Sequence, residues 1–194
     1  MTDHQAIARE QSAVRDPDGP VRLCDGRGLK RLIRSGLAWL ERHQAAINAL
    51  NVYPVPDGDT GTNMLLTMQS AYQEIQESPE EEVGTIAQKV AHGALMGARG
   101  NSGVILSQIF RGFARSLEGV AAFDSVQFAA AMREAATMAY KGVIKPVEGT
   151  ILTVAREASE VAVTAAAGSE NLVYVLERVV REARDSVTRT PSLL

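Results

Sequence analysis

Helical periodicity is the feature that most restricts the folds open to this chain. From residue 29 to residue 50 the apolar residues follow one face of a helix, with a repeat of about 3.6 residues. These positions are Leu29, Leu32, Ile33, Leu37, Leu40, Ile47 and Leu50. The same spacing returns several times, and no stretch alternates apolar and polar residues well enough to form a strand. The sequence therefore predicts an all-α fold of about seven helices with essentially no sheet.

Loops rich in glycine and proline divide this pattern into separate helices. The segment Asn51 to Thr62 holds two prolines and two glycines, which predicts a loop followed by a helix from Asn63. The run Ser78-Pro79-Glu80-Glu81 has the chemistry of a helix start, so the third helix is expected to begin there or after Gly84. A second glycine-rich loop, over 97–103, precedes a fourth helix.

Capping side chains predict the remaining helices. Asp124 with Gln127 can cap one helix, Thr150 can cap the next, and Ser169 can cap the last. The three helices expected from these caps cover 124–140, 150–167 and 169–188.

The first 27 residues differ from the rest of the chain. They are polar and contain the turn-rich stretch Asp16-Pro17-Asp18-Gly19-Pro20, which predicts a flexible lead-in over 1–27. Residues 28–194 are then expected to form one helical domain, since a chain of 194 residues is within the usual size of one domain. No internal repeat of fixed period is visible, which argues against a helical solenoid.

Composition and charge exclude several classes of protein. The formal net charge of −3 gives no reason to expect nucleic acid or an anionic membrane as a partner. The apolar runs are shorter than the roughly 20 residues that a membrane-spanning helix needs. The single cysteine, Cys24, cannot form an internal disulfide, and the first residues lack the basic and apolar regions of a signal peptide. We therefore expect a cytoplasmic protein.

The loop after the first helix carries a candidate metal site. Asp57 and Asp59 are separated by one glycine in a loop stiffened by Pro54 and Pro56. Two such carboxylates can converge on a hard cation, and magnesium would keep positions free for phosphate oxygens. A calcium-binding EF-hand is excluded, because counting from Asp57 neither the sixth residue is glycine nor the twelfth glutamate.

The four residues that follow suit a phosphate. Thr60, Gly61, Thr62 and Asn63 offer hydroxyls and backbone N–H groups at the start of a helix, where an anion is favoured. The alternative for this loop is purely structural, since Asp-Gly-Asp is a common turn and Thr and Asn are common helix caps.

Two more loops of small residues open helices. Gly100-Asn101-Ser102-Gly103 lets backbone approach a phosphate or an adenine ring, although small residues also serve ordinary helix packing. Glu148-Gly149-Thr150 is the third such loop, and by itself it is an ordinary N-cap. The recurrence of this pattern in three loops favours nucleotide binding over three unrelated caps.

Other residues carry no functional signal. Trp39, Phe110, Phe113 and the methionines are expected in the core, and His43, His92 and Cys24 receive no role. The chain has no Gly-x-x-x-x-Gly-Lys-Ser/Thr phosphate loop, no kinase-type His-Arg-Asp and no dinucleotide fingerprint after a strand. If it binds ATP, it does so in an unusual fold.

Three segments, Leu50 to Met64, Gly97 to Gln108 and Lys145 to Leu152, resemble the nucleotide-binding subunit of the dihydroxyacetone kinase family. Within this family the chain is most similar to the N-terminal domain of bacterial fatty acid kinase, from Cys24 to Leu194. The resemblance implies a barrel-like bundle of about seven to eight antiparallel helices, with ATP or ADP and two magnesium ions at one end.

The resemblance also implies roles for individual residues. Asp57 and Asp59 would be the metal ligands and the catalytic residues. The nucleotide-binding set would be Thr60, Gly61, Thr62, Asn63, Asn101, Ser102, Gly103 and Thr150. In dihydroxyacetone kinases a third aspartate precedes the pair and a histidine follows it. Here those places are taken by Asn51 or Val52 and by Thr60, and Asn51 is the candidate third ligand.

These departures are typical of the fatty acid kinase branch. Its members phosphorylate the carboxylate of a fatty acid that a separate fatty-acid-binding protein presents, and they continue into further domains that could form a homodimer. We therefore expect an N-terminal domain that binds nucleotide and that other domains complete for catalysis. Two alternatives stay open, a glycerone-type kinase subunit and a non-catalytic nucleotide-binding module.

Overall fold

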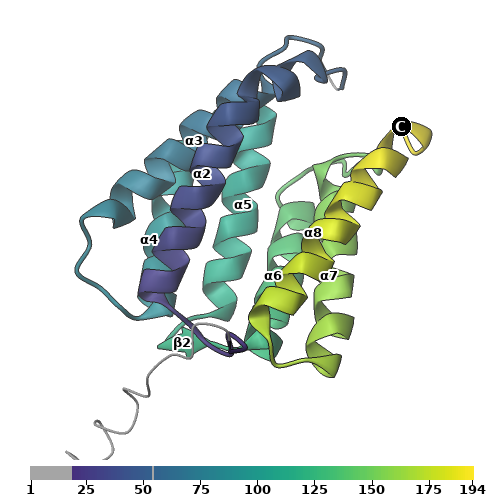
Figure 1. Ribbon diagram of the computed structural model, residues 1–194. Helices are drawn as coiled ribbons and strands as arrows, with labels where there is room; N and C mark the ends of the chain where they lie inside the picture. Colours follow the sequence, from purple (N-terminus) through teal and green to yellow (C-terminus); the bar gives the residue numbers. More distant parts are fainter. Residues whose placement is uncertain (1–18, 54) are drawn as a thin grey trace, which may run out of the picture.

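The computed structural model describes residues 19–53 and 55–194, which fold into an up-and-down bundle of seven α-helices (Figure 1). The helices are α2 (Gly26–Ala49), α3 (Thr60–Gln76), α4 (Val83–Met96), α5 (Gly100–Ser116), α6 (Ser125–Lys141), α7 (Ile151–Gly168) and α8 (Leu172–Arg189). A short 3-10 helix, η1 (Thr190–Ser192), follows α8. The predicted all-α class and helix number are confirmed for the described residues. In that part of the chain no helix is long and apolar enough to cross a membrane.

The chain is ordered earlier than the expected domain start at residue 28. Strand β1 (Cys24–Asp25) pairs antiparallel with β2 (Ala122–Phe123), and the Asp25 side chain caps α2 by accepting from the Gly28 N–H at 2.8 Å. These two-residue strands were not anticipated, because such short segments carry no periodicity. Residues 1–18 of the expected flexible lead-in lie outside the described residues.

The capping predictions have mixed outcomes. The box of Asp124 and Gln127 at the start of α6 is confirmed, with both reciprocal hydrogen bonds formed. The box at Ser78 is wrong, because the Ser78 hydroxyl instead accepts from Lys89 Nζ at 2.8 Å. Helix α4 begins at Val83, close to the second expected start after Gly84. The cap at Ser169 is also wrong.

Asn171 caps α8 in its place, by accepting from the Val173 N–H at 3.1 Å. Ser169 accepts from the Asn171 N–H and therefore stabilises the turn before the helix. Helix α3 begins at Thr60, three residues before the expected start at Asn63.

Aliphatic and small side chains form the core. Ile75, Val83, Ile86 and Leu117 are fully buried, and the rings of Phe113, Phe123 and Phe128 pack with centroids 5.8–6.2 Å apart. Phe110 and Phe113 pack against this core, as expected.

Trp39 is not a core residue. Its side chain is 60% exposed and lies against the ring of His43 at 4.5 Å. The buried face of α2 is centred on Leu29 and Ile33, and ten residues after Leu29 a helix has turned by nearly a quarter of a circle away from that face. The methionines divide in the same way, with Met68 buried and Met96 exposed.

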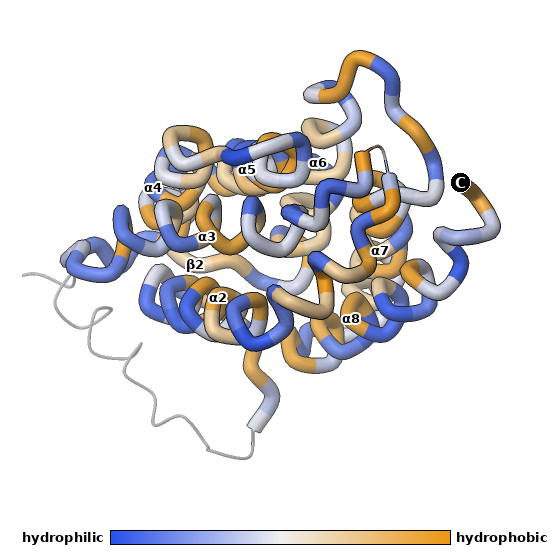
Figure 2. Tube along the Cα trace, turned by 90° about the horizontal axis from the view of Figure 1, so that it is seen from above, coloured by the Kyte–Doolittle hydropathy of each residue, from blue (hydrophilic) through white to orange (hydrophobic). Residues whose placement is uncertain are grey.

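The alternating direction of the helices determines at which end of the bundle each one begins. Each helix runs antiparallel to the next, so α3, α5 and α7 all begin at the same end of the bundle (Figure 1). Seen from above, α3 lies between α2 and α5 (Figure 2), and it packs against both. Helix α5 packs extensively on α6 and so joins the first four helices to the last three.

Candidate functional site

The three loops of small residues that the sequence singled out lie at one end of the bundle (Figure 1). They precede α3, α5 and α7, which share a direction because one antiparallel helix separates each from the next. The unpaired N–H groups and the positive dipole ends of three helices therefore face the same region. This end of the bundle suits an anionic ligand.

Asp57 and Asp59 lie directly before α3. Asp57 is exposed and Asp59 is half-buried, and Gly58 between them has a φ of 69° that favours glycine. Asp59 takes the N-cap position without using its side chain as the cap. Across the described residues, neither carboxylate has a hydrogen bond or an ion pair. Both are therefore available for a cation.

The chemistry of these donors fits magnesium. Within residues 19–53 and 55–194 no group of three or more His, Cys, Asp or Glu side chains could hold a metal ion. An ion at Asp57 and Asp59 would thus take most of its ligands from phosphate oxygens and water, as magnesium commonly does.

Asn51 closes the same loop. Its amide nitrogen donates to the Val55 carbonyl at 2.6 Å, and its amide oxygen accepts from the Thr60 hydroxyl. The oxygen proposed as a third metal ligand thus already accepts one hydrogen bond and retains a second lone pair. The amide holds the loop closed around Asp57 and Asp59.

Thr62 and Gly61 face α2. The Thr62 hydroxyl accepts from Gln44 Nε2 at 2.9 Å and Asn48 Nδ2 at 3.0 Å, and the Thr62 N–H donates to Asn48 Oδ1 at 3.1 Å. A Cβ at Gly61 would lie 2.4 Å from the Gln44 carbonyl oxygen. These contacts fix the start of α3 against α2. Sequence reasoning missed Gln44 and Asn48, although two amides four residues apart on a helix are a readable signal.

The second loop meets the first. A Cβ at Gly100, where φ is 55°, would lie 2.4 Å from Asn63 Nδ2, so only glycine fits there. The Ser102 hydroxyl donates to the Thr60 carbonyl at 3.4 Å. The starts of α3 and α5 therefore form one surface, and the predicted residues of both loops are brought together. Asn101 is exposed at this surface.

Thr67 links α3 to the loop before α5. It is fully buried, donates to the Asn63 carbonyl at 2.8 Å and accepts from the Arg99 N–H at 3.3 Å. A Cβ at Gly103 would lie 2.4 Å from its hydroxyl. Sequence reasoning missed Thr67, because a threonine among apolar helix positions does not show which groups it will contact.

The third loop lies at the same end without joining the first two. Thr150 caps α7, accepting from the Leu152 N–H at 3.3 Å and donating to the Val147 carbonyl at 2.8 Å. No hydrogen bond links it to residues 57–63 or 97–103 in the described part of the chain. Sequence reasoning named Glu148 only as part of this loop and missed its contacts, since its carboxylate accepts from Thr153, Tyr140 and Arg156. These hydrogen bonds, that from Thr153 first, lower the pKa of Glu148.

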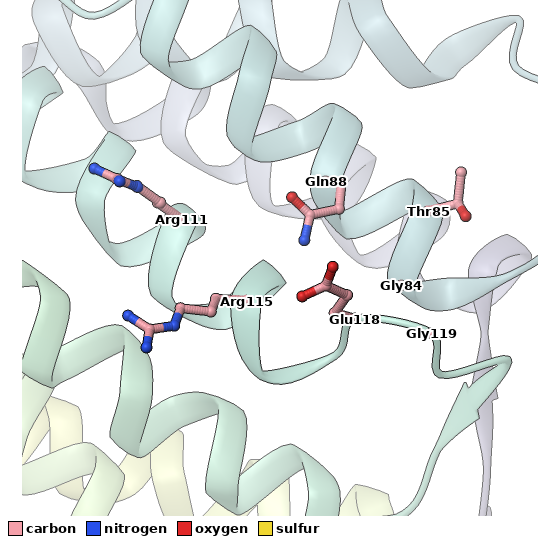
Figure 3. A pocket seen from close by; sticks show the side chains of 7 residues that line it. All are labelled: Gly84, Thr85, Gln88, Arg111, Arg115, Glu118 and Gly119. Carbon is pink, nitrogen blue, oxygen red and sulfur yellow. The ribbon is translucent and has the colours of Figure 1, made fainter.

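A surface hollow lies elsewhere. It has a volume of about 390 Å³ and lies between α4 and the C-terminal half of α5, with Gln88, Arg111, Arg115 and Glu118 in its wall (Figure 3). Figure 3 shows the Glu118 carboxylate pointing toward Gln88, with both arginine side chains directed away from it. None of the predicted site residues lines this hollow. The candidate site, formed by loops and helix starts, therefore lies outside this hollow.

Comparison with known sequences agrees with this arrangement. The sequence profile of the DAK2 domain matches residues 54–194, which include all three loops except Asn51 to Tyr53. Protein YloV of Bacillus subtilis strain 168 is 46% identical over 174 residues, which cover 90% of this chain and 32% of YloV.

Two staphylococcal relatives are similar to the same degree. The uncharacterized protein SSP1546 of Staphylococcus saprophyticus is 45% identical over 174 residues, covering 90% of this chain and 32% of the relative. The uncharacterized protein SAOUHSC_01193 of Staphylococcus aureus strain NCTC 8325 is 43% identical over 170 residues, covering 88% of this chain and 31% of the relative. The chain thus spans about a third of the length of these relatives.

Proposed function

The chain belongs to the DAK2 domain family, the nucleotide-binding L-subunit family of the dihydroxyacetone kinases, and on that premise we propose a specific kinase activity for it. Family membership makes it a kinase-type nucleotide-binding domain. We propose that it binds ATP with magnesium at the joined starts of α3 and α5. The γ-phosphoryl group would pass to the carboxylate of a fatty acid held by a separate protein.

One observation carries the proposal: the two carboxylates of Asp57 and Asp59 have no partner among the described residues and lie at the N-terminus of α3. These two carboxylates can bind a cation. The positive end of the helix beside them favours the anion, such as a phosphate, to which that cation is also bound. Gly100 and Gly103 support it, because they let the start of α5 approach Asn63 and Thr67 too closely for any side chain.

The chain's own residues would position and neutralise the phosphates. Asp57 and Asp59 would hold the cation, which supplies positive charge against the triphosphate when bound. Backbone N–H groups at the starts of α3 and α5 would donate to phosphate oxygens, where negative charge develops during transfer. A fatty acid carboxylate is already a nucleophile, so no general base is required, and positioning is the main task of the protein.

The acceptor is proposed from the residues around the aspartate pair. Asn51 or Val52, and Thr60, stand where dihydroxyacetone kinases carry an aspartate and a histidine, and Asn51 and Thr60 form a hydrogen bond with each other. This replacement supports a fatty acid over a small hydroxyketone. Exposed apolar side chains flank the aspartate loop, with Leu50 76%, Val52 72% and Val55 57% exposed. Apolar residues gathered on one exposed loop favour docking of a protein that presents the substrate.

Calorimetric titration of magnesium–ATP tests the site. We expect binding by the native chain, and a loss of at least about tenfold in affinity in the Asp57→Asn/Asp59→Asn variant, because two charged ligands are removed. Asp185→Asn on the exposed side of α8 is the matched control and should bind as the native chain does. Circular dichroism establishes that all three remain helical.

Equal binding by the native chain and the double variant would overturn the metal site. Absence of binding by the folded native chain would overturn the nucleotide proposal for this domain. For the acceptor, transfer of radiolabelled γ-phosphate to a lipid-loaded fatty-acid-binding protein supports the fatty acid, and transfer to dihydroxyacetone supports the glycerone alternative. Binding without either transfer in a full-length relative would favour a non-catalytic module.

A further inference from the structure

Glu148, in the third loop, lies at the centre of a hydrogen-bonded cluster. Its Oε1 accepts from the Tyr140 hydroxyl of α6 at 2.8 Å. Its Oε2 accepts from the Thr153 hydroxyl at 2.6 Å and from Arg156 Nη2 at 3.2 Å, both on α7. Arg156 Nε also donates to the Tyr140 hydroxyl at 3.4 Å. Both carboxylate oxygens are therefore fixed by side chains from two different helices.

Thr153 connects this carboxylate to the backbone of the loop. Its side chain is fully buried, and its hydroxyl accepts from the Gly149 N–H at 2.9 Å. A hydroxyl has one proton, so a hydroxyl that donates to Glu148 keeps its lone pairs for the Gly149 N–H. The ionised carboxylate thus sets the direction of the Thr153 hydroxyl and, through it, of the Gly149 peptide.

The other side of Gly149 is held by the end of the chain. Gly149 is buried with a φ of 81°. A Cβ there would lie 2.8 Å from both the Thr190 carbonyl oxygen and the Leu194 nitrogen. The turn is therefore fixed between Thr153 on one side and η1 on the other, and the next residue, Thr150, begins α7.

We propose that Glu148 is a positioning residue for nucleotide binding, which holds the Gly149–Thr150 turn in the orientation that presents the start of α7 to the nucleotide. The inference rests on the proposed function. A nucleotide held at the starts of α3 and α5 lies at the end of the bundle where α7 also begins. The Glu148 cluster fixes the Gly149–Thr150 turn before the ligand arrives, which avoids an ordering cost on binding.

Two pairs of matched variants test this. Glu148→Gln removes the charge at nearly constant shape, and Glu160→Gln removes another carboxylate from Arg156, which it contacts at 3.2 Å, without touching the loop. Thr153→Val removes the buried hydroxyl at nearly constant volume, and Thr153→Ser keeps it. We expect Glu148→Gln and Thr153→Val to weaken magnesium–ATP binding roughly tenfold, and the two controls to change it by less than about twofold.

A second readout separates positioning from general stability. In the ligand-free chain, Glu148→Gln and Thr153→Val should speed amide hydrogen exchange at Gly149 and Thr150, with little change at residues 60–63. A merely structural role would lower the thermal midpoint of unfolding but leave the affinity of the folded chain unchanged.

The outcomes are distinguishable from failure of the proposed function. Equal affinity of the native chain and Glu148→Gln would overturn the positioning role while nucleotide binding stands. An equal loss in Glu160→Gln would also overturn it, because the effect would then follow charge near Arg156. A native chain that binds no nucleotide would overturn both, whatever the exchange rates show.

Discussion

The hydroxyl of Thr67 shows how one side chain can fix a functional surface. It bonds to the Asn63 carbonyl and to the Arg99 N–H, and so ties the first turn of α3 to the loop before α5. Gly103 leaves the space that this hydroxyl occupies. A buried hydroxyl that loses its hydrogen-bond partners destabilises the fold. Thr67 and Gly103 together therefore specify how close the starts of α3 and α5 lie.

At this scale we predict the effect of Gly103→Ala. The added methyl would lie 2.4 Å from Thr67 Oγ1, so the helices must separate or the hydroxyl must lose its bonds. We expect a loss of about 1–3 kcal/mol in the free energy of unfolding, as for other overpacked sites, together with weaker magnesium–ATP binding. Urea denaturation measures the first effect.

Gly168→Ala is the control for that experiment. An added methyl at Gly168 meets nothing within 4 Å, so its stability should equal or slightly exceed that of the native chain. Native stability in Gly103→Ala would show that the two helix starts can move apart freely.

Among the elements, helix starts rather than helix interiors carry the specific information. The Asp25, Asp124, Thr150 and Asn171 side chains each accept from a backbone N–H in the first turn of a helix. Asp59, at the start of α3, leaves its carboxylate unused. Glu82 and Arg99, at the starts of α4 and α5, also form no side-chain cap among the described residues. A helix start without such a cap keeps its N–H groups for other partners, and at α3 and α5 the proposed partner is the nucleotide.

The capping box of α6 gives a prediction for a helix away from the site. Asp124→Ala removes the acceptor of the Gln127 N–H at 2.8 Å. The expected cost is about 1 kcal/mol in the free energy of unfolding, with unchanged nucleotide affinity. Thermal and urea unfolding would measure the cost, and Asp124→Asn, which can still cap, should lose less. A large change in affinity would show that the start of α6 also affects the nucleotide site.

On the scale of the whole molecule, ionic contacts tie the third loop to α7 and, through Glu157, to α8. Arg156 contacts Glu148 and also Glu157 at 3.5 Å, and Glu157 contacts Arg189 of α8 at 2.5 Å. These side chains are partly exposed, so each contact is individually weak. Together they link the start of α7 to the last helix of the bundle.

This network predicts how stability depends on pH. The pKa of Glu148 is lower in the folded chain than its ordinary value of 4.5, through hydrogen bonds from Thr153 first and then Tyr140, with Arg156 adding to them. A carboxyl group with a lowered folded pKa contributes stability that is present above the unfolded pKa and lost as the pH falls through the folded pKa. Stability should therefore decrease below about pH 4.5.

Glu148→Gln should reduce this part of the acid sensitivity. Denaturation of both chains at about pH 6 and about pH 4 compares them, and their difference in stability should be smaller at the lower pH. If the two chains differ in stability by the same amount at both pH values, the ionised form of the Glu148 carboxylate does not stabilise the fold.

Much of the fold and part of the candidate site follow from local sequence signals. The apolar repeat of α2, the Asp124–Gln127 box and the three loops of small residues were all readable because each depends on neighbours within about four residues. The starts of α3, α4 and α8 differ from the expected ones. The caps predicted for α4 and α8 were wrong because Ser78 and Ser169 have other partners in the folded chain.

By itself, the sequence determined the helical class, the positions of the loops and the residue types at each helix start. These depend on backbone geometry and on short-range hydrogen bonds, which a local pattern encodes. Only the tertiary structure decided that Thr60 and Ser102 meet, that Gln44 and Asn48 hold Thr62, and that Glu148 is fixed by Tyr140 and Arg156. Such contacts depend on the direction and packing of helices distant in sequence, and no periodicity along the chain records them.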